Sequence, residues 1–266
     1  MGWMQQIAGL IDFRAILTLV LIFVPLELLF PHKRAQGPFR KHWLNDVVFL
    51  LLNGIVIKLG FLLIISAAMV GIGLVVPPAI GLAVRQQPIW LQAIEAVIVA
   101  DIGFYLAHRT FHRVPFLWKF HVIHHSIAEL DWLAAHRVHP VDQILTAASS
   151  YIPLFILGFS VEAIAVQVFL YQWQSHLIHS NVRLPFGPLK WVFASPLYHH
   201  WHHANDAAAY DRNFSAQLTF MDVLGGTLRL PAEMPDRLGL DEALPDAYHL
   251  QLAHPFRRTR SPAAVL

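Results

Sequence analysis

The histidines are the main chemical feature of this chain. They number 17 of 266 residues, nearly as many as the 19 lysines and arginines. Most fall into four groups, with the patterns HxxxH at 108–112, HxxHH at 121–125, HxxH at 176–179 and HxxHH at 199–203. Residues three or four positions apart share one face of a helix, so each group would direct its imidazoles one way. Neutral imidazole is the commonest metal ligand in proteins. The groups therefore predict a metal site.

The number of clustered histidines indicates two ions rather than one. Ten ligands are too many for one four- to six-coordinate ion. The expected ligands are His108, His112, His121, His124, His125, His176, His179, His199, His202 and His203. His200 points away from its neighbours by helix geometry, and His136 and His139 could either line the pocket or serve local structure. The isolated His32, His42, His249 and His254 are more typical of caps or surface positions.

Polar residues near the histidines could orient the ligands by accepting the second imidazole N–H. The candidates that we expect to support catalysis in this way are Asp101, Asn181, Asn213 and Asp222, with Asp131, Asp142 and Asn205 as further choices. Asp101 lies two helical turns before His108, on the same face. A carboxylate near the membrane end of a span is costly unless it has a partner, which favours an inward role.

The ligand types narrow the choice of metal but do not fix it. Acidic residues are scarce among the clustered histidines. A nearly all-nitrogen site suits Fe, Zn, Cu or Ni and argues against magnesium and calcium. Cysteine is absent, which excludes zinc–thiolate sites, cysteine nucleophiles and Cys-ligated iron–sulfur clusters. Imidazole alone leaves iron and zinc equally open.

The composition predicts an all-α integral membrane protein. Only 14% of the residues are charged and 56% are hydrophobic, whereas soluble domains carry about 25% charge. Four stretches could form the membrane-embedded part: 15–30, 46–76, 88–107 and 144–173. The last is interrupted at 157–160 by Gly158, which predicts a helical hairpin of two short halves. We expect three spans, the hairpin and a His-rich helical cap, in one domain over residues 1–266.

The positive charges predict the orientation. Sixteen of the 19 lysines and arginines either follow the first apolar stretch closely or follow His108, and cytoplasmic segments carry the excess of these residues. The first stretch lacks the basic flank and cleavage site of a signal peptide. We expect a bacterial inner membrane protein with the N-terminus outside and the histidines and C-terminus in the cytoplasm. The scattered basic residues do not suggest nucleic-acid binding.

The motifs resemble those of the fatty acid hydroxylase/sterol desaturase superfamily, and in particular its bacterial sterol desaturase family proteins. The resemblance covers roughly residues 90–230 and follows the order HxxxH, HxxHH, HxxHH. Its residues lie in YLAHRTFH at 105–112, FHVIHHS at 120–126, RVHP at 137–140, HSN at 179–181, SP at 195–196 before His199 to His203, and NF at 213–214. The chain departs from the family pattern at Ser215, where glycine or alanine is commoner, and at Gly225, where an aromatic residue is more usual.

The resemblance implies a catalytic region over 90–230 that is a non-haem di-iron oxygenase. Two iron ions would use O2 and two external electrons to hydroxylate or desaturate a C–H bond of a lipid or sterol-like substrate. Zinc could replace iron in a purified sample. A lipid could enter sideways from the bilayer, along a route lined by Phe104, Tyr105, Trp118, Trp132 and Trp173, although such aromatics are also ordinary at membrane interfaces.

The electrons are expected from a separate donor. The sequence has no GxGxxG turn and no CxxCH haem site, so a ferredoxin, cytochrome or reductase would supply them at the cytoplasmic face. The basic excess there could attract an acidic donor.

Two other functions compete with this hypothesis. A zinc-dependent membrane hydrolase is weakened by the absence of HExxH from the sequence. A metal transporter or sensor would need ionisable residues deep in several spans, where the sequence offers only Lys58, Glu95 and Asp101.

Overall fold

Every regular element that the structure describes is helical. The computed structural model describes residues 12–257 except 58, 61, 65 and 67–77. Pairing of the β type in these residues is limited to three isolated bridges. The longer helices are α2 (Phe13–Leu29), α6 (Ile89–Arg113), α7 (Pro115–His125), α8 (Pro140–Ile156) and α9 (Val161–His179). The shorter ones are α3 (Trp43–Val48), η1 (Phe49–Asn53), α5 (Pro78–Arg85), η2 (Trp132–His136), η3 (Gly187–Trp191), α10 (Pro196–His202), α11 (Phe220–Gly225), α12 (Tyr248–Ala253) and η4 (His254–Phe256). The all-α prediction is confirmed for this part of the chain.

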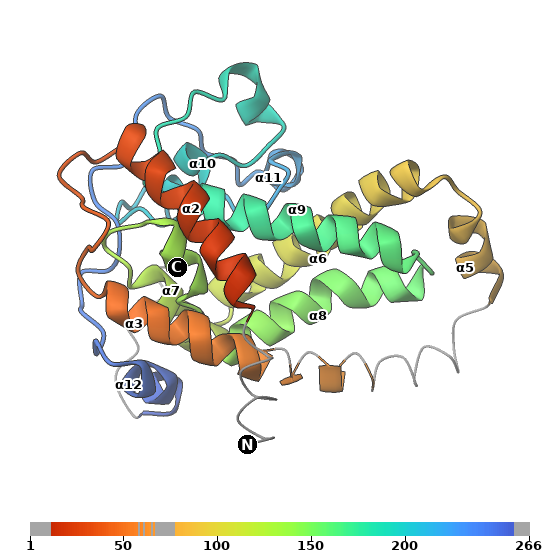
Figure 1. Cartoon of the computed structure of the whole chain (residues 1–266), viewed down its shortest axis with the longest axis horizontal. Coiled ribbons are helices and arrows are strands. Elements are labelled where there is room, and N and C mark those ends of the chain that lie inside the picture. The colour runs from red at the N-terminus through yellow and green to blue at the C-terminus, as the bar shows by residue number, and fades with distance from the viewer. Residues whose placement is uncertain (1–11, 58, 61, 65, 67–77, 258–266) are drawn as a thin grey trace.

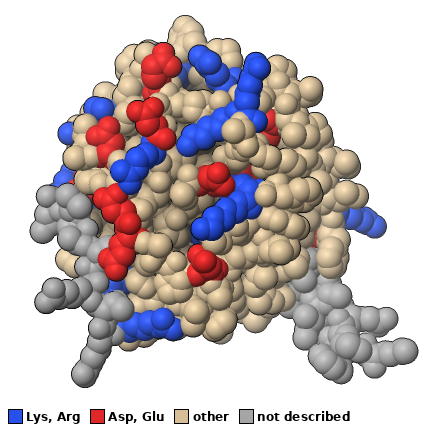
Figure 2. Space-filling model, turned by 90° about the vertical axis from the view of Figure 1, so that its left-hand side faces the viewer, with Lys and Arg blue, Asp and Glu red and all other residues tan. Residues whose placement is uncertain are grey.

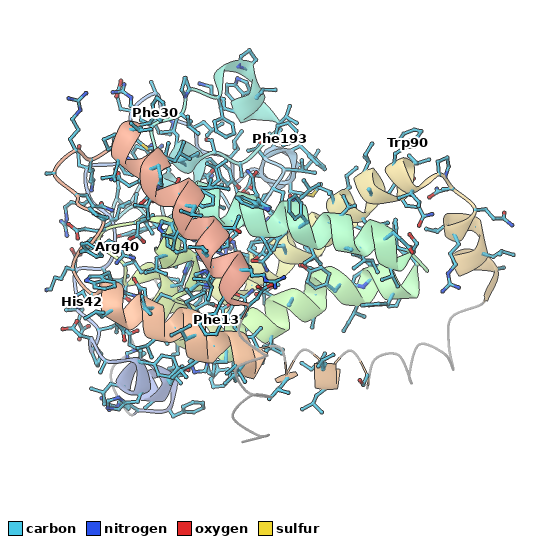
Figure 3. The ribbon with its side chains drawn as sticks, in the orientation of Figure 1. Phe13, Phe30, Arg40, His42, Trp90 and Phe193 are labelled. Carbon is cyan, nitrogen blue, oxygen red and sulfur yellow. The ribbon has the colours of Figure 1, made fainter. Side chains whose placement is uncertain are left out.

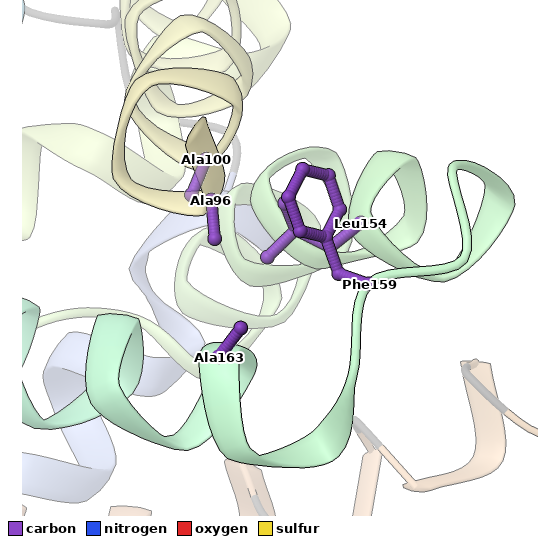
Figure 4. Close-up of a cluster of buried hydrophobic side chains, with 5 residues drawn as sticks. All are labelled: Ala96, Ala100, Leu154, Phe159 and Ala163. Atoms are coloured by element: carbon purple, nitrogen blue, oxygen red, sulfur yellow. The ribbon is translucent and has the colours of Figure 1, made fainter. Parts of the chain in front are cut away.

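Helices α6, α8 and α9 lie side by side and form the elongated half of the molecule (Figure 1). Alanines on α6 and α9 let the helices approach, and a small apolar cluster fills the space between them (Figure 4). Its buried members are Ala96, Ala100, Leu154, Phe159 and Ala163. At Gly103 the α6 backbone comes so close to α8 that a Cβ there would lie 2.1 Å from the Ser149 carbonyl oxygen. The bundle thus depends on small residues at its contacts.

The predicted hairpin at 144–173 is confirmed. Helix α8 ends at Ile156 and α9 begins at Val161, so the break falls at the expected Gly158. Ser160 caps α9 by accepting the Ala163 N–H with its hydroxyl oxygen (3.3 Å). The amide of Ser160 in turn donates to the side chain of Gln92 (3.0 Å). These bonds join the hairpin turn to the start of α6.

Two described helices are long and apolar enough to cross a membrane, Trp43–Ile64 and Ile89–Arg113. The first combines α3 and η1 with the residues that follow, and the remainder of the predicted 46–76 span lies outside the described residues. Only 33% of the apolar stretch of α6 is buried, whereas the core helix of a soluble protein would be mostly buried. The exposed Phe13 and Trp90 (Figure 3) add to this apolar exterior. These features favour a membrane protein.

The histidine-bearing end of the bundle is covered by residues 114–139 and 180–257, which we call the cap. The side of the molecule at the left of Figure 1 carries basic and acidic side chains intermixed (Figure 2). Helix α2 packs on this end through Phe23, whose ring stacks on those of Trp132 and Trp173. The carboxylate of Glu27 accepts the backbone N–H groups of Trp132 (2.8 Å) and Asn181 (3.0 Å).

A buried network of four charges ties α3 to the cap. Arg40 donates to Asp46 (2.6 Å) and to Asp131 (2.7 Å), and Arg137 makes two hydrogen bonds to Asp46. All four side chains are nearly inaccessible to water. Arg40, counted in the sequence among the charges that set orientation, is therefore committed to an internal role.

Replacing Asp46 with asparagine should destabilise the protein strongly. The change preserves the shape of the side chain but leaves two buried guanidinium groups short of an anion, which costs about 3–5 kcal/mol. Thermal unfolding in detergent measures the effect.

The matched control is Asp241→Asn, because Asp241 forms an ion pair with Arg237 that is open to solvent and exposed pairs contribute little. Equal melting temperatures for the two variants would contradict the structural role of the buried network.

Candidate metal centre

Nine histidines converge into two groups at the end of the bundle. The first group contains His108, His112, His121, His125 and His202, and the second contains His124, His179, His199 and His203. Within each group, one ring nitrogen from every member lies within 4.8 Å of all the others. Four helices supply these side chains, from segments nearly 100 residues apart along the chain.

Each HxxHH motif divides its histidines between the two groups. On α7, His121 and His125 face the first group while His124 faces the second. At α10 and its C-cap the division is reversed. His202, at position i+3 of the motif, faces the first group, and His199 and His203, at positions i and i+4, face the second. A helix turns about 100° per residue, so positions i and i+4 are about 40° apart while i+3 lies about 60° to the other side. One helix can therefore serve two adjacent sites.

The nitrogen spacing fits metal ligands. Two nitrogens that bind an ion at about 2.1 Å and at right angles are about 3.0 Å apart. In the second group the Nε2 atoms of His124, His179 and His199 are 2.8–3.1 Å from their neighbours. In the first group, Nε2 of His121 is 3.0 Å from that of His108 and 3.2 Å from that of His125. Both groups have room for an ion at their centre.

Backbone carbonyls hold the other nitrogen of several rings. Nδ1 of His108 lies 2.7 Å from the Phe214 oxygen, and Nδ1 of His202 lies 2.8 Å from the Arg212 oxygen. A carbonyl only accepts, so each Nδ1 carries the proton and each Nε2 keeps its lone pair. The Nε2 atom of His202 is buried without a hydrogen-bond partner among the described residues. A buried imidazole nitrogen that has a free lone pair and no hydrogen-bond donor is suited to bind a metal ion.

His121 uses a carboxylate instead. Its Nδ1 lies 2.7 Å from Asp142, whose other oxygen accepts a bond from Thr146 (3.2 Å). Such a carboxylate fixes the ring orientation and raises the basicity of the ligand.

The remaining histidines of interest lie outside both groups. Nε2 of His176, one of the ten expected ligands, is 3.0 Å from Nε2 of His136. His139 caps α8 by accepting the Val141 N–H (3.1 Å). His200 faces the Ser180 carbonyl (3.1 Å).

The expected polar residues act on the backbone around the groups. Asp101 accepts the backbone N–H groups of residues 216–218 at 2.8–3.0 Å, rather than an imidazole N–H. Asp222 accepts the N–H of Phe214 (2.8 Å), the residue whose carbonyl holds His108. Asn213 has φ +61° and bridges Tyr198 to Arg229 through hydrogen bonds of 2.7–2.8 Å. These side chains fix the loop that faces the first group.

Asn181 has a different place. Its side chain accepts the N–H of Lys33 (2.9 Å) and donates to the carbonyl of the same residue (3.1 Å). It thereby fastens the chain after α2 to the end of α9. His179 of the second group lies two positions earlier in the chain.

Gly225, which departs from the family pattern, lies where an aromatic side chain does not fit. A Cβ at this position would be 1.9 Å from the Tyr105 hydroxyl oxygen. That hydroxyl accepts from Arg109 (2.8 Å) and bonds to Thr227 (3.1 Å). The glycine therefore makes room for this hydrogen-bonded group.

Sequence reasoning missed the carbonyl acceptors and the buried charge network. Any residue can present a carbonyl, so residues 137, 212 and 214 carry no signal in their side chains for this role. Arg137 has both functions: its carbonyl lies 3.2 Å from Nδ1 of His124 while its guanidinium binds Asp46.

Burial keeps the cap histidines neutral. It lowers the pKa of His202 to about 3, and burial together with neighbouring imidazoles holds the pKa of His203 well below 6.5. Neutral imidazole is the form that binds metal.

A cavity of about 360 Å³ opens onto both groups. His108 and His121 of the first group and His124 of the second line its inner end. Apolar residues of α2 and of the helix over 43–64 form another wall, and α8 and α9 contribute polar residues. Of the five aromatic residues considered for a substrate route, Phe104 lines this cavity.

Comparison with known proteins gives one family and several relatives. The model of the family described as "Fatty acid hydroxylase" matches residues 93–227. The ornithine lipid hydroxylase OlsE of Rhizobium tropici is 29% identical over 91% of this chain and 74% of its own length. The alkylglycerol monooxygenase of Homo sapiens is 33% identical over 52% of this chain, but the match spans 31% of that protein. Methylsterol monooxygenase 1 of Gallus gallus is 23% identical over 54% of this chain and 49% of its own. No solved structure matches the chain.

Adjacent histidines on α10 should affect different ions. His202→Ala removes a member of the first group and His203→Ala a member of the second, so each variant should bind about one ion fewer than the parent. Elemental analysis of purified protein gives the count.

His254→Ala is the control, because this residue belongs to neither group. Full metal content in both α10 variants would contradict the assignment.

Acidification should destabilise the metal-free protein. In the folded chain His202 gains a proton only near pH 3, whereas in the unfolded chain it does so near 6.5. Between these values the unfolded state binds more protons, so the free energy of unfolding falls as the pH falls. Denaturation of chelator-treated protein at pH 8, 7, 6 and 5 tests this, and a constant stability from pH 8 to 5 would refute it.

Proposed function

This chain belongs to the fatty acid hydroxylase family, and from that premise we propose that it is an O2-dependent, non-haem di-iron oxygenase of a lipid or sterol-like substrate. The three relatives described above are named as hydroxylases and monooxygenases, which supports an oxidoreductase. The single observation that carries the proposal is the division of both HxxHH motifs between two adjacent groups of histidines.

The residues present suit two iron ions. Five imidazoles would hold one ion and four the other, and imidazole is a good ligand for iron. When bound, the two ions would activate O2 so that one oxygen atom enters a C–H bond while two electrons and two protons convert the other to water. The protein supplies neutral nitrogen donors, fixed in orientation by Asp142 and by the carbonyls of Phe214, Arg137 and Arg212.

The cavity supports a lipid substrate. Its volume lies at the lower end of the range for ligand sites, so it would admit only the reacting segment of a lipid. The rest of the molecule would extend past the apolar residues of α2 and the 43–64 helix, which include Ile16, Leu19 and Leu50. Relatives named for ornithine lipids, alkylglycerols and methylsterols suggest the lipids to try first.

Asp101, Asn213 and Asp222 would serve the reaction as positioning residues. They fix the loop over 213–218, which places the Phe214 carbonyl against His108. Asn181 would do the same at the end of α9, next to His179. His176 would bind metal only if it moved away from His136, so we propose the nine grouped histidines as the ligand set.

We further propose a bacterial inner membrane location, with the metal groups and the C-terminus on the cytoplasmic side. A separate ferredoxin, cytochrome or reductase would bring the electrons there. The excess of lysines and arginines after the first apolar stretch and after His108 supports this orientation.

Isotope labelling distinguishes this function from the alternatives. Iron-loaded protein in membranes, given a lipid extract, an electron donor and ¹⁸O2, should yield a lipid product that carries one ¹⁸O atom or has lost two hydrogens. Mass spectrometry measures both.

A hydrolase would act without O2 and take its oxygen from water, and a transporter would yield no product. Turnover under anaerobic conditions would contradict the proposal. A protein with Ala in place of His108 and His124, one residue from each group, is the inactive control.

A further inference from the structure

The first metal group comes close to the surface of the cap at one place. Among the nine grouped histidines, His112 is the one that is not fully buried, and 9% of its side chain is exposed. Its Nδ1 lies 3.7 Å from a carboxylate oxygen of Asp211. All four histidines of the second group are buried. His112 is therefore the most exposed of the nine grouped histidines.

Three arginines surround Asp211 at this place, and we call Arg109, Arg113, Arg212 and Asp211 the arginine patch. The Arg113 guanidinium is 3.6 Å from the Asp211 carboxylate and 54% exposed. Arg109 and Arg212 are close enough to help lower the pKa of that carboxyl group, although its burial outweighs them and raises the pKa. Three cations and one anion give the patch a net charge of +2.

The patch is joined to the first metal group by direct contacts. The carbonyl of Arg212 accepts the Nδ1–H of His202 at 2.8 Å. The exposed Arg212 is therefore connected to His202, a proposed metal ligand, by one hydrogen bond from its own backbone carbonyl. Two further contacts lie between the patch and the first group or beside that group. The Asp211 carboxylate lies beside His112. The centroid of the Trp118 ring is 5.1 Å from that of His112 and 5.2 Å from that of His125.

We propose that the arginine patch is the docking surface for a small acidic electron-carrier protein, and that electrons enter at the first metal group. This inference rests on the proposed function. In each encounter the carrier loses one electron and an iron(III) ion gains it to become iron(II). Two encounters supply the two electrons of one turnover.

The charge and the position argue for this partner. Complementary charge raises the rate of encounter between proteins without requiring a large interface, and electron-transfer complexes are typically small and short-lived. The patch offers a positive surface directly over His112, whereas the second group has no exposed member. An acidic carrier that docks on the patch would therefore lie close to a histidine of the first group. The four histidines of the second group are buried and offer no such exposed position.

Charge reversal at Arg113 tests the docking surface without turnover. Two acidic one-electron carriers serve as probes, a plant-type [2Fe–2S] ferredoxin and cytochrome b5, both in the oxidised state. Titration calorimetry with the full-length protein in detergent measures the Kd at two ionic strengths. Arg113→Glu should raise the Kd of the carrier that binds by about tenfold or more at low salt, and the loss should shrink at high salt.

Two matched variants separate the patch from general charge. Arg113→Lys keeps the positive charge and should retain most of the affinity. Arg183→Glu makes the same charge change at an exposed residue in the segment after α9 and should bind like the parent. Equal affinities for Arg113→Glu and Arg183→Glu, or no binding of either carrier to the parent, would overturn the proposal.

A single-turnover assay keeps this test distinct from that of the proposed function. Protein reduced chemically and then exposed to O2 needs no carrier. If the parent forms no oxidised lipid under these conditions, the proposed function fails. If the parent and Arg113→Glu form equal product here, but the variant is slower when the carrier supplies the electrons, the patch acts in docking. Equal rates with the carrier would exclude that role.

Discussion

The structure depends on the need to hold nine imidazoles together with little exposure to water. Burying a polar nitrogen without a hydrogen-bond partner costs free energy. In the second group, two Nε2 atoms nevertheless lie only 2.8 Å from each other. The helices of the bundle and the cap bring them together, and outward bonds from Nδ1 to carbonyls and to Asp142 fix five of the nine rings. A cation bound in either group would take the lone pairs that these nitrogens direct toward one another.

The segment over 211–229, which supplies two of these carbonyls, is itself held in place by hydrogen bonds. Asp101 accepts three backbone N–H groups from it, and Asp222 accepts bonds from residues on both sides of the turn, including Phe214 and Thr227. These bonds keep the carbonyls of residues 212 and 214 directed at His202 and His108. Residues 211–219, which lie outside any regular helix, thus have the precision that ligand positioning requires.

Much of the fold could be predicted from the sequence because it follows from local patterns. The hairpin break at Gly158 and the helical HxxHH motifs depend on neighbours in the chain, and the structure has them where they were expected. The division of each motif between two groups of histidines follows from the same helical geometry, but choosing which histidines pair requires knowing how α7 and α10 face each other.

Other features had no local signal. Arg40 looks like a surface charge in the sequence, and its pairing with Asp46 and Asp131 depends on how distant segments pack. His176 shares an HxxH pattern with His179, yet the turn of α9 directs it to His136. Pattern alone places side chains on a helix face but does not say what lies opposite.

The interleaved HxxHH motifs also bear on how such a centre can change over time. A one-residue insertion within α7 would swing the following histidine by about 100°, and His121, His124 and His125 would then no longer reach the same pair of ions. Because one short helix serves both positions, neither can be remodelled alone. A change in one group of histidines on this helix would therefore disturb the other group as well.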